Sequence, residues 1–269
     1  MTVIINQGMK ALIIILLIAV STAAAQVSAF RFRPERVQVG TVFHYLKTNV
    51  DGKQPENVST YIAARERIES FKFHEKGTRA GLVIAEVDWQ EFIVRRLESW
   101  QVNSKDERKL FATLTYDTAK QSVVVSIPAA KPEPEVAKID RLPYHLYNFD
   151  LAGLNVMFAH LADPKRAFVV GIADPTFKAD PLFAYKGELT ITYEKEERRN
   201  GVECRRYSAA GNGIGGKGTV WVNKKRGHIE DMEFDVANNP DWKTFKLKLV
   251  KTEKMTAAQW QLFISGHFK

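Results

Sequence analysis

The sequence has very little cysteine: Cys204 is the only one among 269 residues. A single cysteine cannot form an intramolecular disulfide, so the stability of the fold must come from a packed core. Arg205 and Arg206 follow it and could lower the pKa of its thiol, as in a reactive cysteine. Free cysteine is nevertheless among the most often buried side chains, which favours an inert position inside a strand.

The sequence also lacks the common motifs of hydrolases that work outside the cytoplasm. It contains no G-x-S-x-G, no S-x-x-K and no H-E-x-x-H, so no residue is nominated as a nucleophile or a general base. We therefore expect a protein that is not an enzyme and that carries no cofactor. A pair of carboxylates in a cleft would escape this search, because nothing in the sequence selects one pair over another.

Metal and nucleic-acid motifs are missing as well. The six histidines are scattered, with no pair at the short spacings of metal ligands, namely His44, His74, His145, His160, His228 and His267. Ala-Asp-Pro occurs at 162–164, 173–175 and 179–181, and an aspartate before proline is typical of turns. We predict turns at these three places, no metal site, and no nucleic acid as partner.

Long apolar runs are absent except for one at the N-terminus. Residues 11–20, ALIIILLIAV, follow Lys10 and precede the small residues STAAAQVSA. This order predicts a signal peptide over residues 1–25, cut between Ala25 and Gln26, with a cut after Ala29 as the alternative. An uncleaved membrane anchor is disfavoured because a spanning helix needs about 20 apolar residues. No cysteine follows the run, so we predict that the chain is not a lipoprotein.

The charge is mildly basic, with a formal net value of +8. Lysine and arginine occur in short pairs along the chain, usually beside glutamate or aspartate, as expected of a solvated surface. Attraction to an anionic membrane surface is the second interpretation.

Alternation of apolar and polar residues dominates residues 26–269. Leu189, Ile191 and Tyr193, for example, alternate with Glu188, Thr190 and Thr192. Such alternation predicts strands with one buried face, as in an antiparallel sheet. About ten such strands predict a mainly β fold, a curved antiparallel sheet shaped as a half-barrel or open barrel, within a single domain.

The strand pattern breaks at about residues 128–181, where we predict a proline-rich linker and a helix. Asp150 is the expected N-cap of a helix over residues 151–161. Its apolar stripe, with a spacing of four and three residues, consists of Leu151, Leu154, Phe158 and Leu161, preceded by Tyr147. A capping box at Thr256 and Gln259 predicts a second short amphipathic helix, with Gly266 as its C-cap.

The glycine-rich stretch AGNGIGGKGT, residues 210–219, resembles a phosphate-binding loop. Such loops must open a helix, however, and Thr219 begins a strand-like segment of β-branched and aromatic residues. Gly218 also stands where a P-loop has serine or threonine. We therefore predict no bound nucleotide and a connection between two strands, with positive φ at Gly211, Gly213, Gly215 or Gly216.

Several turn and strand segments resemble a family of uncharacterised exported bacterial proteins. They are FDLAGLN at 149–155, GVECRRY at 201–207, GTVWVN at 218–223, GHI at 227–229 and DWKTFKL at 241–247. That family is similar in outline to the lipoprotein-localisation-factor superfamily, in which short helices cover a half-barrel around an apolar cavity. The resemblance implies a location in the periplasm of a Gram-negative bacterium, and transfers no catalytic residue.

Three functions are left open at this point. The first is a carrier for a lipid, acyl chain or lipidated protein on the concave face, contacted by Tyr147, the four stripe residues of the predicted helix, and Trp221. The second is an envelope structural or assembly factor that docks another protein and has a filled core. A hydrolase of envelope polymers is the least favoured, because no motif nominates its residues.

Overall fold

The computed structural model describes residues 29–74, 77–103, 107–176, 180–235 and 243–267. The predicted signal peptide, with its cut between Ala25 and Gln26, lies outside the described residues. Within them, no helix is long and apolar enough to cross a membrane.

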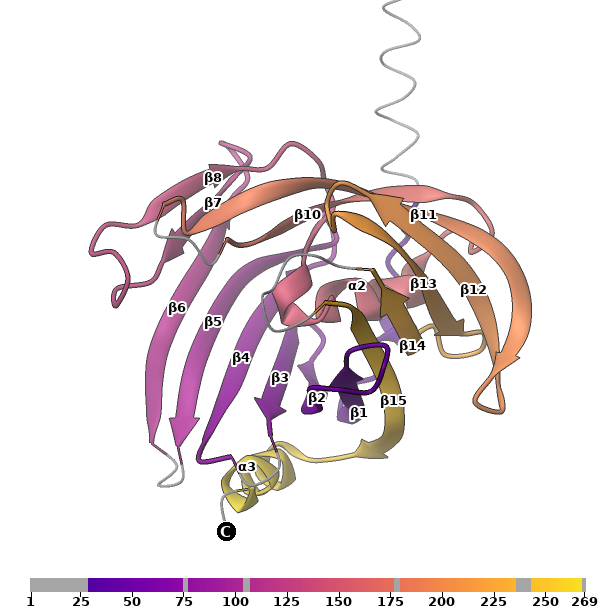
Figure 1. Ribbon diagram of the computed structural model, residues 1–269, viewed down its shortest axis with the longest axis horizontal. Helices are drawn as coiled ribbons and strands as arrows, with labels where there is room; N and C mark the ends of the chain where they lie inside the picture. The colour runs from indigo at the N-terminus through magenta and orange to yellow at the C-terminus, as the bar shows by residue number, and fades with distance from the viewer. Residues whose placement is uncertain (1–28, 75–76, 104–106, 177–179, 236–242, 268–269) are drawn as a thin grey trace, which may run out of the picture.

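The described residues form one open, curved sheet of fifteen strands (Figure 1). From edge to edge the strands are β8 (Glu135–Lys138), β7 (Ser122–Ser126), β6 (Arg108–Asp117), β5 (Ile93–Asn103), β4 (Arg79–Asp88), β3 (Arg67–Phe73), β2 (Glu56–Ala64), β1 (Thr41–Thr48), β15 (Phe245–Lys254), β14 (Ile229–Phe234), β13 (Gly216–Asn223), β12 (Val202–Gly211), β11 (Phe183–Arg199), β10 (Phe168–Pro175) and β9 (Tyr144–Leu146). Neighbours are antiparallel except β9 and β10, which are parallel.

The mainly β class and the curved sheet are as predicted, but the number of strands is fifteen and not about ten. Part of the difference comes from the proline-rich segment, which forms β8 and β9 where only a linker and a helix were predicted. These two strands are the two edges of the sheet, and neither of them contains a proline. The alternating stretch at residues 58–73 is two strands, β2 and β3, with a tight turn after Ala64.

The sheet curls until strands from its two halves meet. β8 contacts β11, and β9 contacts β5, so the ends of the sheet approach each other across the top of the molecule (Figure 1). The concave face holds the main core, which contains side chains such as Phe43, Leu97, Val170, Leu189 and Val222. Successive residues of a strand face opposite sides, so the alternation in the sequence sets this division.

Helix α2 (Ala152–Met157), between the 3-10 turns η2 (Tyr147–Phe149) and η3 (Phe158–His160), lies inside the curl (Figure 1). It is shorter than the predicted helix over residues 151–161, and Asp150 does not cap it. Asp150 and Leu151 both have left-handed backbone, with φ of 49° and 52°. The Asp150 carboxylate instead pairs with Lys47 and Lys72, as expected of a buried charge, which needs a partner.

Helix α3 (Ala257–Gly266) covers the outer face of the sheet. Trp260 is fully buried against Tyr61 and Phe71 of the neighbouring strands, and its Nε1 donates to Glu69 at 2.7 Å. The predicted capping box between Thr256 and Gln259 is present. Gly266 is the last helical residue and not the C-cap, which is His267.

The glycine-rich stretch is a hairpin connection. Gly211 ends β12, Gly216 begins β13, and the two glycines pair with each other. Gly215 has a φ of 68°, and Gly211 also has positive φ, as predicted. At Gly211 a Cβ would lie 2.1 Å from the carbonyl oxygen of Glu188, so only glycine fits. Lys217 lies within β13, so the stretch has no helix N-terminus of the kind that binds phosphate.

Candidate functional site

The predicted stripe of the helix is packed into the core. Leu151, Leu154, Phe158 and Leu161 are all at most 4% exposed. Phe158 lies against Phe168 and Tyr207, with ring centroids 5.9 Å and 5.4 Å apart. Tyr147 is half-buried and packs on Phe245. The structure therefore brings the helix residues together as a filling of the curl, and their contact with a ligand stays a prediction.

Trp221, grouped with them by the sequence, lies on the opposite face of the sheet. Its neighbours Val220 and Val222 belong to the concave core, so the alternation of a strand points Trp221 outward. There its Nε1 donates to Glu197 at 2.6 Å, and the Arg199 guanidinium lies 4.0 Å from the ring centre. The structure separates Trp221 from the helix stripe.

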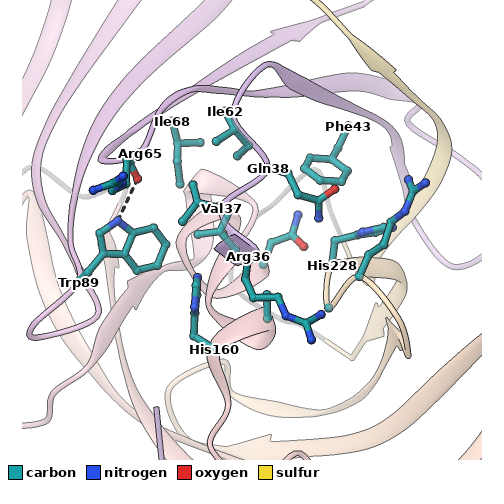
Figure 2. Close-up of a pocket in the computed structure, with 15 residues that line it drawn as sticks. Arg36, Val37, Gln38, Phe43, Ile62, Arg65, Ile68, Trp89, His160 and His228 are labelled. Atoms are coloured by element: carbon teal, nitrogen blue, oxygen red, sulfur yellow. Dashed lines mark hydrogen bonds between the residues drawn. The ribbon is translucent and has the colours of Figure 1, made fainter. Parts of the chain in front are cut away.

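The space next to the helix on the side of β1 to β3 is almost filled. A pocket of about 20 Å³ remains there, bordered by Phe43, Ile68, Trp89 and His160 (Figure 2). The indole nitrogen of Trp89 donates to the carbonyl oxygen of Arg65 at 2.9 Å. This volume is sufficient for about one water molecule, so it is no site for an acyl chain.

A larger cavity, of about 270 Å³, lies between β4 to β7 on one side and η2, β10 and β11 on the other. We call it the apolar cavity. Seven of its seventeen lining residues are buried hydrophobic side chains: Leu97, Leu114, Val125, Leu146, Phe149, Leu182 and Phe183. Its rim includes Phe111, which is 41% exposed, together with Ala130 and Asn148. A large exposed aromatic ring beside an apolar cavity is typical of an entrance for a hydrophobic ligand.

The cavity exists because small side chains occupy two neighbouring inward positions. Leu97 of β5 pairs with Leu114 of β6 and fills the space between sheet and helix. At the next inward-facing position, two residues away on each strand, Ser99 pairs with Ala112. Serine and alanine leave the volume that two leucines would take. That these two residues pair depends on the strand register and on a bulge after Ser99. The alternation in the sequence does not predict either feature, so the cavity was not predicted.

One wall of the cavity carries a carboxyl group, that of Asp174. The side chain is 5% exposed, and its Oδ1 accepts a hydrogen bond from the backbone N–H of Asn148 at 2.8 Å. Burial raises the pKa of Asp174 to about 7, because a low-dielectric environment disfavours the charged form.

Only some of the three Ala-Asp-Pro segments behave as predicted. Asp174 was predicted in a turn but lies in strand β10, whose last residue, Pro175, is paired with Phe183 of β11. Asp163 does form a turn, since its Oδ1 accepts from the backbone N–H of Lys165 at 2.9 Å. Asp180 lies in an exposed bend.

Near Asp174, a largely buried network of two lysines and two carboxylates lies around Asp150. Lys47 Nζ lies 2.9 Å from Glu56 Oε2 and 3.3 Å from Asp150 Oδ1, and Lys72 Nζ lies 2.6 Å from Asp150 Oδ2. Burial alone would raise the pKa of Asp150, but the two lysines together hold it below its usual value. The four charges cancel, so the network is a neutral unit.

Two other groups singled out by the sequence have clear positions. Cys204 is fully buried, and burial raises the pKa of its thiol to about 12, which supports the inert interpretation. Within the described residues, no three His, Cys, Asp or Glu side chains gather as a metal site would require.

No protein-family model matches the chain, and no curated protein matches it. Three solved structures are similar in outline. A beta-barrel-like protein of domain of unknown function DUF1849 from Brucella abortus has 9% identity and a TM-score of 0.41, over 80% of this chain and 96% of its own. The hypothetical lipoprotein YmcC from Escherichia coli has 9% identity and a TM-score of 0.30, over 89% and 96%.

The third is a putative outer membrane lipoprotein-sorting protein domain from Vibrio parahaemolyticus, with 10% identity and a TM-score of 0.25 over 87% of this chain and 94% of its own. The neighbours are thus a domain of unknown function, a lipoprotein and a lipoprotein-sorting domain, the kinds of protein that the resemblance in the sequence indicated.

Proposed function

We propose that the protein is a non-catalytic binding or carrier protein that holds a hydrophobic chain segment in the apolar cavity. The observation that carries the proposal is the cavity itself. Its walls are mainly hydrophobic and come from β4 to β7 on one side and from η2, β10 and β11 on the other. Its rim includes the exposed ring of Phe111. Burying apolar surface in such a site is favourable by about 25 cal/mol per Å².

The volume of the apolar cavity limits the size of the ligand. At roughly 30 Å³ for each water-sized group, a cavity of about 270 Å³ has room for about nine non-hydrogen atoms. A single acyl segment fits, whereas a whole two-chain lipid does not. Of the candidates left open by the sequence, this favours one acyl chain, or the end of one, over an entire lipid.

The first described residues fit export by a cleaved leader. Phe30 stacks on Phe92 with ring centroids 5.1 Å apart, and the carbonyl oxygen of Ala29 accepts from the N–H of Ala162 at 2.9 Å. A cut after Ala29 would remove this hydrogen bond, and a cut between Ala25 and Gln26 would keep it. We therefore favour the earlier cut and a periplasmic location, with intact mass of the mature chain as the measurement.

A cavity-filling variant tests the proposed function. In Ala112→Phe the new ring takes up much of the cavity, while Ala210→Phe adds the same ring at an exposed position of β12. We expect 1-octanol, with nine non-hydrogen atoms, to bind the wild type and Ala210→Phe equally, as measured by calorimetric titration. Ala112→Phe should weaken binding at least ~10-fold. Equal binding by all three proteins, or none by the wild type, would overturn the proposal.

A second function, docking of an envelope protein, is favoured by edge strand β8. Val136 on this strand is 67% exposed, and an edge strand has unpaired backbone groups that can bind another strand. If the wild type were crosslinked to an envelope protein in intact cells and Val136→Lys were not, while 1-octanol still bound to both, docking would be the primary role. Attraction to an anionic membrane surface stays a prediction.

A further inference from the structure

The carboxyl group of Asp174 is the polar feature of the apolar cavity that the packing of the protein does not explain. In the part of the chain that the structure describes, its hydrogen bonding consists of the single contact from the N–H of Asn148 to Oδ1. A carboxylate has two oxygens and about four acceptor sites. A side chain this deeply buried is normally paired with a cation or with several donors.

The lysines around Asp174 do not supply that partner. Lys72 Nζ is bound to Asp150 at 2.6 Å and donates to the carbonyl oxygen of Asn148 at 2.5 Å. Lys47 lies between Glu56 and Asp150. Lys186 and Lys72 both act to lower the pKa of Asp174 and Asp150 acts to raise it, yet burial outweighs them and the pKa remains raised. The carboxylate is therefore only partly compensated by its own protein.

A positively charged donor in the cavity would complete this environment. The aliphatic walls would take the chain of such a ligand, and Asp174 would accept a charge-assisted hydrogen bond from its head, which is about twice as strong as a neutral one. A carboxylate head would instead meet a like charge in a low-dielectric site. Asp174 would thus discriminate between amphiphiles of the same length by the charge of their polar end.

We propose that the apolar cavity selects single-chain amphiphiles with a primary amine at the polar end, and that Asp174 binds this amine. The inference rests on the proposed function, because it assumes that the cavity holds a hydrophobic chain, and it names the class of ligand. Free fatty acids are the class that it disfavours.

Three probes of equal chain length test the selection at pH 8. They are octylamine, whose amine is protonated at this pH like that of lysine, 1-octanol and octanoate. We expect the wild type to bind octylamine at least ~10-fold more tightly than 1-octanol, and octanoate most weakly, as measured by calorimetric titration. Octanoate binding as tightly as octylamine would overturn the inference.

The variant Asp174→Asn should lose the preference for the amine while binding 1-octanol as the wild type does. Its side-chain oxygen can still accept from Asn148, so the fold is retained. Asp51→Asn, which removes a negative charge from an exposed turn, is the matched control and should keep the preference. An amine preference that survives in Asp174→Asn would refute the role of Asp174. If 1-octanol binds but no preference exists, only this inference fails; if no probe binds, the proposed function fails as well.

Discussion

Replacing Asp174 by asparagine removes a titrating charge from the wall of the apolar cavity, and should stabilise the protein in a pH-dependent way. The pKa of this carboxyl is about 7 in the folded chain, against an ordinary value of 3.8. The folded state therefore binds the proton more tightly than the unfolded state. Protonation of Asp174 therefore stabilises the folded state. This contribution is complete below pH 3.8 and is lost as the pH rises through about 7.

The size of the effect follows from the two pKa values. Each tenfold difference in proton affinity corresponds to about 1.4 kcal/mol, so ionised Asp174 destabilises the folded state by about 4 kcal/mol at pH 8. At pH 5 the carboxyl is protonated in the folded state and mostly ionised in the unfolded state, and keeping it protonated only about 1.2 pH units above its ordinary pKa costs about 2 kcal/mol. Asparagine stays neutral at both values, so Asp174→Asn should exceed the wild type by these amounts.

Urea denaturation of both proteins at pH 5, 6, 7 and 8 measures this difference directly. Buried His145 and His160, whose pKa values are lowered by burial to about 3 and about 4, destabilise both proteins alike as the pH falls, so they cancel in the comparison. A difference in the free energy of unfolding that stays constant from pH 5 to pH 8 would refute the reasoning. So would a variant less stable than the wild type at pH 8.

Three further predictions concern the core and the glycine connection. Asp150→Asn should cost about 3–5 kcal/mol in the free energy of unfolding, because it leaves Lys47 and Lys72 without their shared anion; an unchanged urea midpoint would contradict this. Gly211→Ala should cost about 1–3 kcal/mol, whereas Gly81→Ala, where a Cβ meets no neighbour, should cost less than half as much. The Cys204 thiol should react with a thiol reagent only after unfolding, and rapid reaction of the native protein would disprove its burial.

The alternation of residues was sufficient to predict which side of a strand faces the core. Leu189 and Ile191 are fully buried and Thr190 and Thr192 are exposed, as their positions indicated. The same local reasoning failed for β8 and β9, because short edge strands depend on a partner far away in the sequence. It also failed for Asp150, whose partners Lys47 and Lys72 come from distant strands.

The candidate site could be predicted only in part. The helix stripe was correctly identified as apolar, but the sequence does not show whether an apolar helix covers a cavity or fills it. The cavity itself depends on the pairing of Ser99 with Ala112, and on the packing of η2 and β10 against them, both of which are non-local. Asp174 was interpreted as a turn residue because Asp-Pro is common in turns, and only the strand around it shows that it is buried.

Native mass spectrometry of the mature protein, recovered under mild conditions from the cells that make it, shows directly whether the apolar cavity holds a ligand. We expect a one-to-one adduct with a hydrophobic molecule in the wild type and in Ala210→Phe. For Ala112→Phe, in which the cavity is filled, we expect the mass of the protein alone. Recovery of the wild type without any adduct, together with no uptake of 1-octanol or octylamine, would contradict the proposed function.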